Sequence, residues 1–224
     1  QRGEDSKGLK RSASLLLLGQ VLQALADTQG AVLAFTKCKM IRKKALRPDD
    51  PSLALVNMQL GQLFDRVAGQ QPQGDERTRL LQAAQQLLEL AFAQTKRALG
   101  PEHEDTYRRL AALASHYVTR RQPGRAIKLL RRAANGLVKR LGPAHSDVAR
   151  VWNNLGVALS ASGAHQQALK TYRRAEALLA RAVGGWHPET QSVRINITGT
   201  LLRLGKIKAA LRQGQQASRQ LLGQ

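Results

Sequence analysis

The chain has 224 residues, enough for one compact domain or a short repeat array, and 42% of them are apolar. Aromatic residues make up only 4%, which suits helices packed through Ala and Leu better than a β-sandwich, and the ordinary Gly and Pro contents argue against wholesale disorder. Because 36 Lys and Arg face only 15 Asp and Glu, the net charge is +21, and we expect an anionic partner: nucleic acid, an acidic protein face or an anionic membrane surface.

The cysteine count and the ends of the chain bear on location. A single cysteine, Cys38, excludes an internal disulfide and fits a reducing, intracellular compartment. The sequence contains no run of eighteen apolar residues, so we expect no membrane span. Since the first residue is Gln1 rather than Met, we expect that something upstream was removed, either a cleaved targeting peptide or a truncated segment. Together with the basic charge, this favours a mitochondrial location.

The first predicted pair of helices covers residues 9–26 and 29–45. Leu15, Leu18 and Leu22 recur at helical spacing in the first of them. The same stretch imitates a secretory signal, because basic residues precede its leucines. Two glutamines interrupt its apolar run, however, so we interpret it as a folded helix.

A second pair is predicted over residues 52–68 and 76–98. Relative to the other pairs it carries eleven extra residues. They fall around a Gly-Gln-Gln-Pro-Gln-Gly segment, which is polar and rich in turn-forming residues. We therefore expect a loop insertion at 69–76.

Three later pairs are separated by a recurring Leu/Val-Gly-x-x-His motif. It ends at His103, His145 and His187, a spacing of 42 residues twice. Zinc holds its ligand nitrogens at about 2.0–2.1 Å, whereas equivalent atoms of stacked repeats lie roughly 10 Å apart. We therefore exclude a shared metal site and expect the histidines to cap or pack the turns. The helices of these pairs are predicted near 105–120 and 124–140, 146–162 and 165–183, and 189–204 and 207–222.

One register runs through all five pairs. It is clearest in the unit that contains Trp152, where Leu155, Gly156 and Leu159 form one helical stripe. Small residues on such stripes let two antiparallel helices approach closely, while larger residues fill the gaps. After a break at Gly163, a second stripe consists of Ala168, Tyr172 and Ala175. The first position of the pattern falls at residues 15, 57, 110, 152 and 194, in steps of 42, 53, 42 and 42.

This pattern resembles the tetratricopeptide repeat (TPR), whose Trp-Leu-Gly-Tyr…Ala-Phe-Ala signature is matched by the stripes around Trp152 and Tyr172. The family's final helix-ending proline is absent. The 42-residue length and the Asn153-Asn154-Leu155-Gly156 segment are similar to the repeats of kinesin light chains. The resemblance implies an all-α, right-handed α-solenoid of about five antiparallel helical hairpins, with first helices lining a concave groove and second helices forming a convex back. As a single domain over 1–224, it would consist of units near 9–45, 52–98, 105–140, 146–183 and 189–222.

Residues off the core stripe of each first helix would face the groove. In the resembling family, asparagines there clamp the backbone of an extended peptide, because an amide both donates and accepts hydrogen bonds. Three asparagines match this pattern, whereas the Ala111-Ala112 pair departs from it, and Asn154 has the alternative role of stabilising the repeat itself. The candidate groove residues are Arg108, Arg150, Asn153, Asn154, Val157, Asn196 and Arg203.

Cations recur on the second helices at i, i+3 and i+4, in the same slots of successive repeats. Residues 119–140 hold eight basic residues and no acidic one. Such a row would bind a phosphate backbone or an acidic protein face; the alternative is a solvated helix face. We define the basic ladder as Lys128, Arg131, Arg132, Lys170, Arg173, Arg174 and Arg212.

No nucleophile with a base, and no pair of carboxylates, stands out in the sequence. We therefore predict that the protein is not an enzyme and has no catalytic residue, cofactor or bound metal. The first functional hypothesis is a protein-interaction scaffold, a structural or adaptor subunit of a large mitochondrial or RNA-containing assembly with acidic protein partners. The alternative is a free adaptor that reads an acidic linear motif in its concave groove, as the resemblance to kinesin light chains implies.

Overall fold

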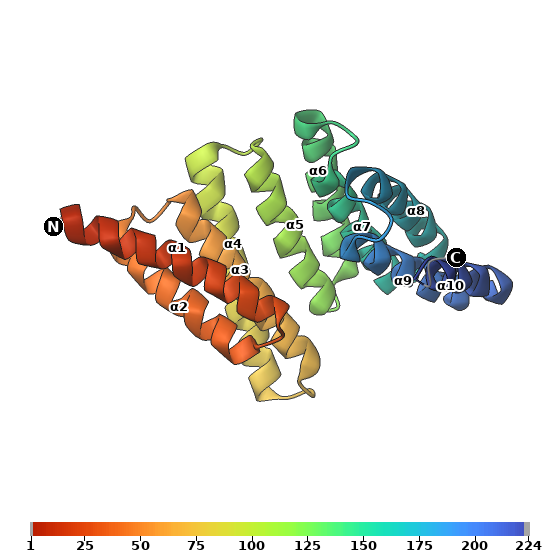
Figure 1. The fold of residues 1–224 in the computed structure, drawn as a ribbon, viewed down its shortest axis with the longest axis horizontal. Coiled ribbons are helices and arrows are strands. Elements are labelled where there is room, and N and C mark those ends of the chain that lie inside the picture. Colours follow the sequence, from red (N-terminus) through yellow and green to blue (C-terminus); the bar gives the residue numbers. More distant parts are fainter. Residues whose placement is uncertain (1, 222–224) are drawn as a thin grey trace. The chain divides into compact units, whose positions relative to one another are not determined.

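A computed structural model describes the backbone of residues 2–221 and the side chains of residues 7–215. Within that range every regular element is an α-helix and none is a strand, which confirms the predicted all-α class (Figure 1). Residues 1 and 222–224, at the ends of the predicted array, lie outside the described range. The chain divides into two compact units, Gln1–Arg120 and Arg121–Gln224. A single continuous solenoid therefore stays a prediction.

The first unit contains five helices in which chain neighbours pack together. Helices α1 and α2 form one antiparallel hairpin, and α3 and α4 form the next (Figure 1). Helix α2 also packs on α3, and α5 packs on both α3 and α4. Phe35 and Leu63 are fully buried in the core between the two hairpins. The helices are α1 (Arg2–Ala24), α2 (Thr28–Ala45), α3 (Pro51–Gln70), α4 (Asp75–Leu99) and α5 (Glu104–Thr119).

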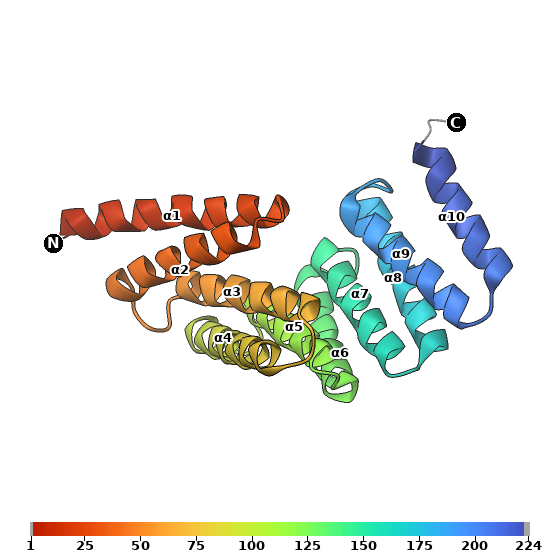
Figure 2. The ribbon, with the colours of Figure 1, turned by 90° about the horizontal axis from the view of Figure 1, so that it is seen from below.

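The second unit continues the same alternation of helices. Helix α7 packs on α6 and α8, and α9 packs on α8 and α10 (Figure 2). Helices α7 and α9 also touch each other, as the first helices of successive repeats do. The third predicted hairpin, near 105–140, has one helix in each unit, so its pairing stays a prediction. The helices are α6 (Pro123–Leu141), α7 (Ser146–Ala161), α8 (His165–Ala182), α9 (Pro188–Arg203) and α10 (Ile207–Leu221).

The close helix contacts fall where the repeat register puts its glycines. A Cβ atom on Gly156 would lie 2.5 Å from the ring of Tyr172, and one on Gly19 would lie 2.5 Å from the ring of Phe35. The glycine of one helix thus receives the large side chain of the next. Gly61 repeats the arrangement, because its Cβ would lie 2.7 Å from Leu88.

The inserted segment of the second pair is shorter as a loop than the predicted 69–76. Only residues 71–74 link α3 to α4. The extra residues lengthen the helices instead: α3 has 20 residues against 16 in α5, α7 and α9, and α4 has 25 against 19 in α6 and 18 in α8. Good helix formers flank the turn, with Arg66, Ala68 and Gln70 before it and Glu76, Arg77 and Arg79 after it. Helix α3 therefore continues to Gln70, and α4 begins directly after Gly74.

Candidate functional site

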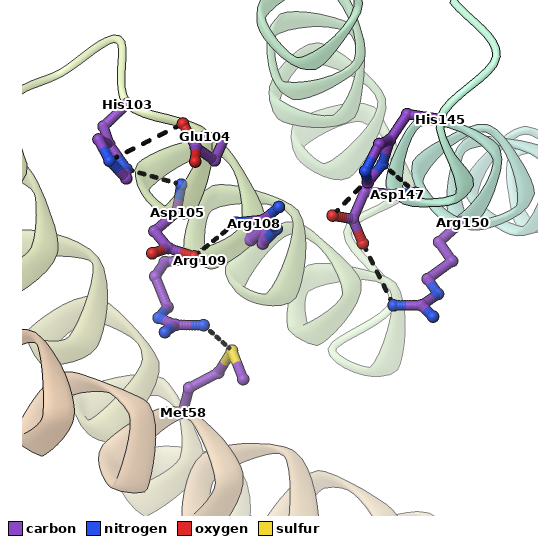
Figure 3. A network of polar contacts seen from close by, with 9 residues as sticks. All are labelled: Met58, His103, Glu104, Asp105, Arg108, Arg109, His145, Asp147 and Arg150. Atoms are coloured by element: carbon purple, nitrogen blue, oxygen red, sulfur yellow. Dashed lines mark hydrogen bonds and ion pairs between the residues drawn. The ribbon is translucent and has the colours of Figure 1, made fainter. Parts of the chain in front are cut away.

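The three repeated histidines cap helices. In His103 and His145 the Nδ1 atom accepts a hydrogen bond from the backbone N–H two residues on, at 3.1 Å in both cases (Figure 3). His187 makes the same bond to Glu189 at 3.3 Å. These bonds satisfy a backbone donor that the helix start would otherwise leave unpaired, which confirms the predicted capping role.

The acidic residue two positions after each histidine holds an arginine of the candidate groove. Asp105 pairs with Arg108 at 2.7 Å, and Asp147 pairs with Arg150 at 3.2 Å (Figure 3). Arg150 also pairs with Glu189 on α9 at 2.9 Å. Arg108 belongs to the first unit, whereas the other candidate groove residues all lie on α7 and α9 of the second.

Polar side chains link α7 to α9 across the predicted groove face. The Asn196 amide donates to the Asn153 carbonyl oxygen at 3.0 Å, and Arg203 donates to the Ser160 hydroxyl at 2.9 Å. These bonds join repeats to each other, so part of the face serves to stabilise the array. The half-buried amide of Asn154 has no hydrogen-bond partner among the described residues. We name Arg150, Asn153, Asn154, Val157, Asn196 and Arg203 the α7/α9 face.

The basic ladder lies on α6, α8 and α10, and all seven of its side chains are exposed. Arg174 differs from the others because its guanidinium stacks 4.3 Å above the Trp152 ring. Such cation–π contact fixes the side chain against the repeat. Within residues 7–215 no ladder cation forms an ion pair with a carboxylate.

Charge is distributed unequally between the units. The first holds eighteen Lys and Arg with twelve Asp and Glu, whereas the second holds eighteen with only three. All three acids of the second unit are already in ion pairs, Asp147 and Glu189 with Arg150, and Glu176 with Arg194 at 2.8 Å. The arginines of α7 and α9 therefore take the available carboxylates, and the ladder keeps its charge. Counting acids by repeat would have indicated this asymmetry from the sequence.

Buried polar links in the first unit were not predicted. His116 is fully buried and contacts Asp65 through Nδ1 at 2.6 Å. Asn57 donates to Gln94 at 2.9 Å, and Gln94 in turn donates to the carbonyl of Pro48. These side chains join helices in the interior, so we assign them a structural role. No sequence pattern marks them, because each pair is more than thirty residues apart.

Two absences concern only the part of the chain that the structure describes. No three His, Cys, Asp or Glu side chains gather there as a metal site would require. Across residues 2–221, no helix combines the length and hydrophobicity that a bilayer crossing needs.

Comparison with known proteins identifies the repeat. A family model described as tetratricopeptide repeat matches residues 112–181 and 147–221. Comparison with curated protein sequences finds no match.

Solved structures share the fold. The nearly identical TPR-like repeats of a protein from Podosopora anserina, described as a kinesin light chain, align with a TM-score of 0.66 at 22% identity, over 94% of this chain and 95% of that one. BtubC (BKLC) from P. vanneervenii gives 0.68 at 20% identity, over 98% and 89%. Aspartyl phosphate phosphatase F from Bacillus subtilis gives 0.71 at 15% identity, over 99% of this chain but only 54% of its own. At such identities the likeness establishes the fold, a TPR-like α-solenoid.

Proposed function

Because residues 112–221 match the tetratricopeptide repeat model and the fold is a TPR-like α-solenoid similar to kinesin light chain repeats, we propose that the chain is a non-catalytic scaffold that binds protein partners. Stacked hairpins offer long surfaces rather than an enclosed pocket that gathers reactive groups. The scaffold would act as a structural or adaptor subunit of a larger assembly.

The basic ladder is the surface on which we propose that an acidic partner docks. The observation that carries this is the unequal pairing of charge: the second unit's three acids are bound to Arg150 and Arg194, while the ladder cations are exposed and lack carboxylate partners among the described residues. Uncompensated cations of one sign attract an anionic surface and raise its rate of association.

An acidic protein face fits the ladder better than RNA does. Proteins that bind single-stranded RNA stack its bases on exposed aromatic rings. The aromatic residue that contacts the ladder is Trp152, and the Arg174 guanidinium already lies over its ring. The charge alone would still attract a phosphate backbone, so an RNA-containing or mitochondrial assembly is the competing version of this proposal.

Binding of two labelled probes, polyglutamate and a single-stranded RNA, tests the ladder by fluorescence anisotropy. We expect polyglutamate to bind, and the triple variant Arg131→Gln, Arg132→Gln and Arg173→Gln to bind it about ten-fold less tightly or worse. Arg174 is left unchanged because it packs on Trp152. The matched control, Lys139→Gln, Arg140→Gln and Arg181→Gln, removes the same charge from exposed sites on the same two helices. Equal losses of polyglutamate affinity in both triple variants would mean that net charge, rather than the ladder, attracts the probe. Tighter binding of RNA than of polyglutamate, with a steep salt dependence, would favour a nucleic-acid partner.

A second candidate is an extended acidic peptide on the α7/α9 face. The observation in its favour is the unpartnered amide of Asn154 beside Arg150, whose side chain remains 52% exposed despite its ion pairs. An amide with free donors and acceptors can pair with any peptide unit. Asn154→Ala would then abolish binding of an extended acidic peptide, whereas the triple ladder variant would still bind it. The reverse result rejects this candidate.

A further inference from the structure

An open groove lies between α1 and α2 of the first unit, whereas the ladder and the α7/α9 face belong to the second unit. Its volume is about 290 Å³. Helix α1 contributes Arg11 and Leu15, one turn apart, and α2 contributes the rest of the lining. We name it the α1/α2 groove, lined by Arg11, Leu15, Lys37, Met40, Ile41 and Lys44.

The α1/α2 groove has an apolar floor and a cationic rim. Leu15, Met40 and Ile41 supply the floor, and Met40 is 59% exposed. The first hairpin, α1 and α2 with the turn between them, exposes six large hydrophobic residues. They are Leu17, Leu18, Val21, Leu25, Leu33 and Met40. Exposed apolar surface of this kind, bordered by charge, is typical of a binding site.

Among residues 7–215, none of the Lys and Arg side chains that line the groove pairs with a carboxylate. Helix α2 carries five Lys and Arg and no acidic residue. The buried guanidinium of Arg42 donates to the Ser12 hydroxyl at 3.2 Å and to the Ser52 carbonyl at 2.6 Å, and neither acceptor is a carboxylate. Burial lowers the pKa of Lys39, and the charge of Lys43 lowers it further. Lys37 and Lys44, the two lysines that line the groove, are both exposed, so an anionic partner has access to them.

We propose that the α1/α2 groove is the docking site for an acidic amphipathic helix of a partner protein. Lys37 and Lys44 stand two turns apart on α2, roughly 10 Å along its axis. A docked helix would place apolar side chains at i and i+3 or i+4 on the floor, with carboxylates at both ends reaching the two lysines. A second copy of this chain is a poor occupant, because it would bring another cationic rim against the first.

The two methionines of the chain give a direct readout. Met40 lies in the groove, whereas Met58 packs against the buried cluster around Leu88 and serves as an internal reference. The probe is a designed helical peptide with Leu at i, i+3, i+4 and i+7 and Glu at the flanking positions. We expect it to shift the ¹³C-methyl resonance of Met40 saturably and to leave that of Met58 in place. A peptide of the same composition, with its leucines scattered around the helix, should shift neither.

Charge reversal tests the rim. Lys37→Glu with Lys44→Glu should weaken binding of the probe about ten-fold or more. The matched control is Lys10→Glu with Lys43→Glu, which makes the same change in net charge at exposed positions outside the groove and should leave binding within about two-fold.

Four outcomes would overturn the proposal. Equal binding of the scattered peptide, or equal losses in the two double variants, would mean attraction by net charge alone. A Met40 shift produced by vesicles containing phosphatidylserine but not by the peptide would identify a lipid surface instead. A Met40 shift that grows with protein concentration in the absence of peptide would mean that a second copy fills the groove.

Discussion

Gly156 lets α7 approach α8, because any side chain there would collide with Tyr172. The added Cβ of Gly156→Ala would lie 2.5 Å from the tyrosine Cε1, and the ring is only 2% exposed, so it has little room to move. Overpacking of this kind costs about 1–3 kcal/mol. We expect Gly156→Ala to lower the free energy of unfolding by that amount in urea titrations followed by tryptophan fluorescence.

Gly199→Ala is the matched control for this substitution. It lies inside α9, where a new Cβ would meet no other atom within 4 Å. Alanine is favoured over glycine in a helix by about 1 kcal/mol, so this variant should be slightly more stable than the natural chain. Similar effects of the two substitutions would show that the α7–α8 contact does not depend on the glycine.

Tyr172 should make the protein sensitive to alkaline pH. Burial raises the pKa of its hydroxyl to about 12, although the nearby charge of Arg203 opposes the shift. The unfolded chain has a tyrosine pKa of about 10. Between these values the native state binds the proton more tightly, so stability is complete below about pH 10 and falls by about 1.4 kcal/mol per unit as the pH rises toward 12.

Urea midpoints at two alkaline pH values test this sign. Between pH of about 9 and about 11, the natural chain should lose roughly 1.4 kcal/mol more than Tyr172→Phe loses. Burial also raises the pKa of Cys38, but that contribution is common to both proteins and cancels. Parallel pH profiles would refute the assignment to Tyr172.

The pattern of the sequence predicted which residues are buried, but not which polar side chains meet. Gly156, Tyr172 and Ala175 occupy stripe positions whose burial follows from helical spacing alone. The Asn153–Asn196 hydrogen bond and the stacking of Arg174 on Trp152 depend instead on how two helices lie against each other. That geometry is set by packing, so it could not be derived from spacing along one helix.

At the scale of the helix, a histidine N-cap begins each of the first helices α5, α7 and α9. His145→Ala removes the acceptor for the Asp147 N–H, and loss of an N-cap costs about 0.5–2 kcal/mol. His145→Asn supplies an oxygen in a similar place and should retain most of the stability. Thermal unfolding of the two variants provides the measurement. Equal melting temperatures of the alanine and asparagine variants would mean that the cap contributes little to stability.

Most helix bounds were predictable because the breaks between helices are chemically marked, but α1 begins at Arg2 rather than near residue 9. Glycines with positive φ, such as Gly100 and Gly142, end helices, and the histidine three residues later begins the next one. The inserted segment lacked a comparable mark on its flanks. Its good helix formers extend α3 and α4, so the loop covers residues 71–74 rather than the predicted 69–76.

At the scale of the whole chain, positive charge exceeds negative charge far more in the second unit than in the first. The second unit has eighteen cations and three anions, so its ladder repels itself. Salt screens such repulsion, since the Debye length is about 10 Å at 0.1 M. The sequence predicted the row of cations. Their lack of carboxylate partners among the described residues depended on where the three acids of the second unit lie in the fold.

Salt should therefore stabilise the second unit. Both tryptophans of the chain, Trp152 and Trp186, lie in it, so their fluorescence reports its unfolding without a signal from the first unit. We expect the unfolding midpoint by fluorescence to rise between about 20 mM and about 300 mM NaCl, because screening relieves more repulsion than it removes attraction from the few ion pairs. The variant with Arg131→Gln, Arg132→Gln and Arg173→Gln has lost part of that repulsion already, and it should gain less from the same salt. A midpoint that falls with salt would mean that the ion pairs of Arg150 and Arg194 outweigh the ladder, and an equal gain in the variant would place the repulsion elsewhere in the unit.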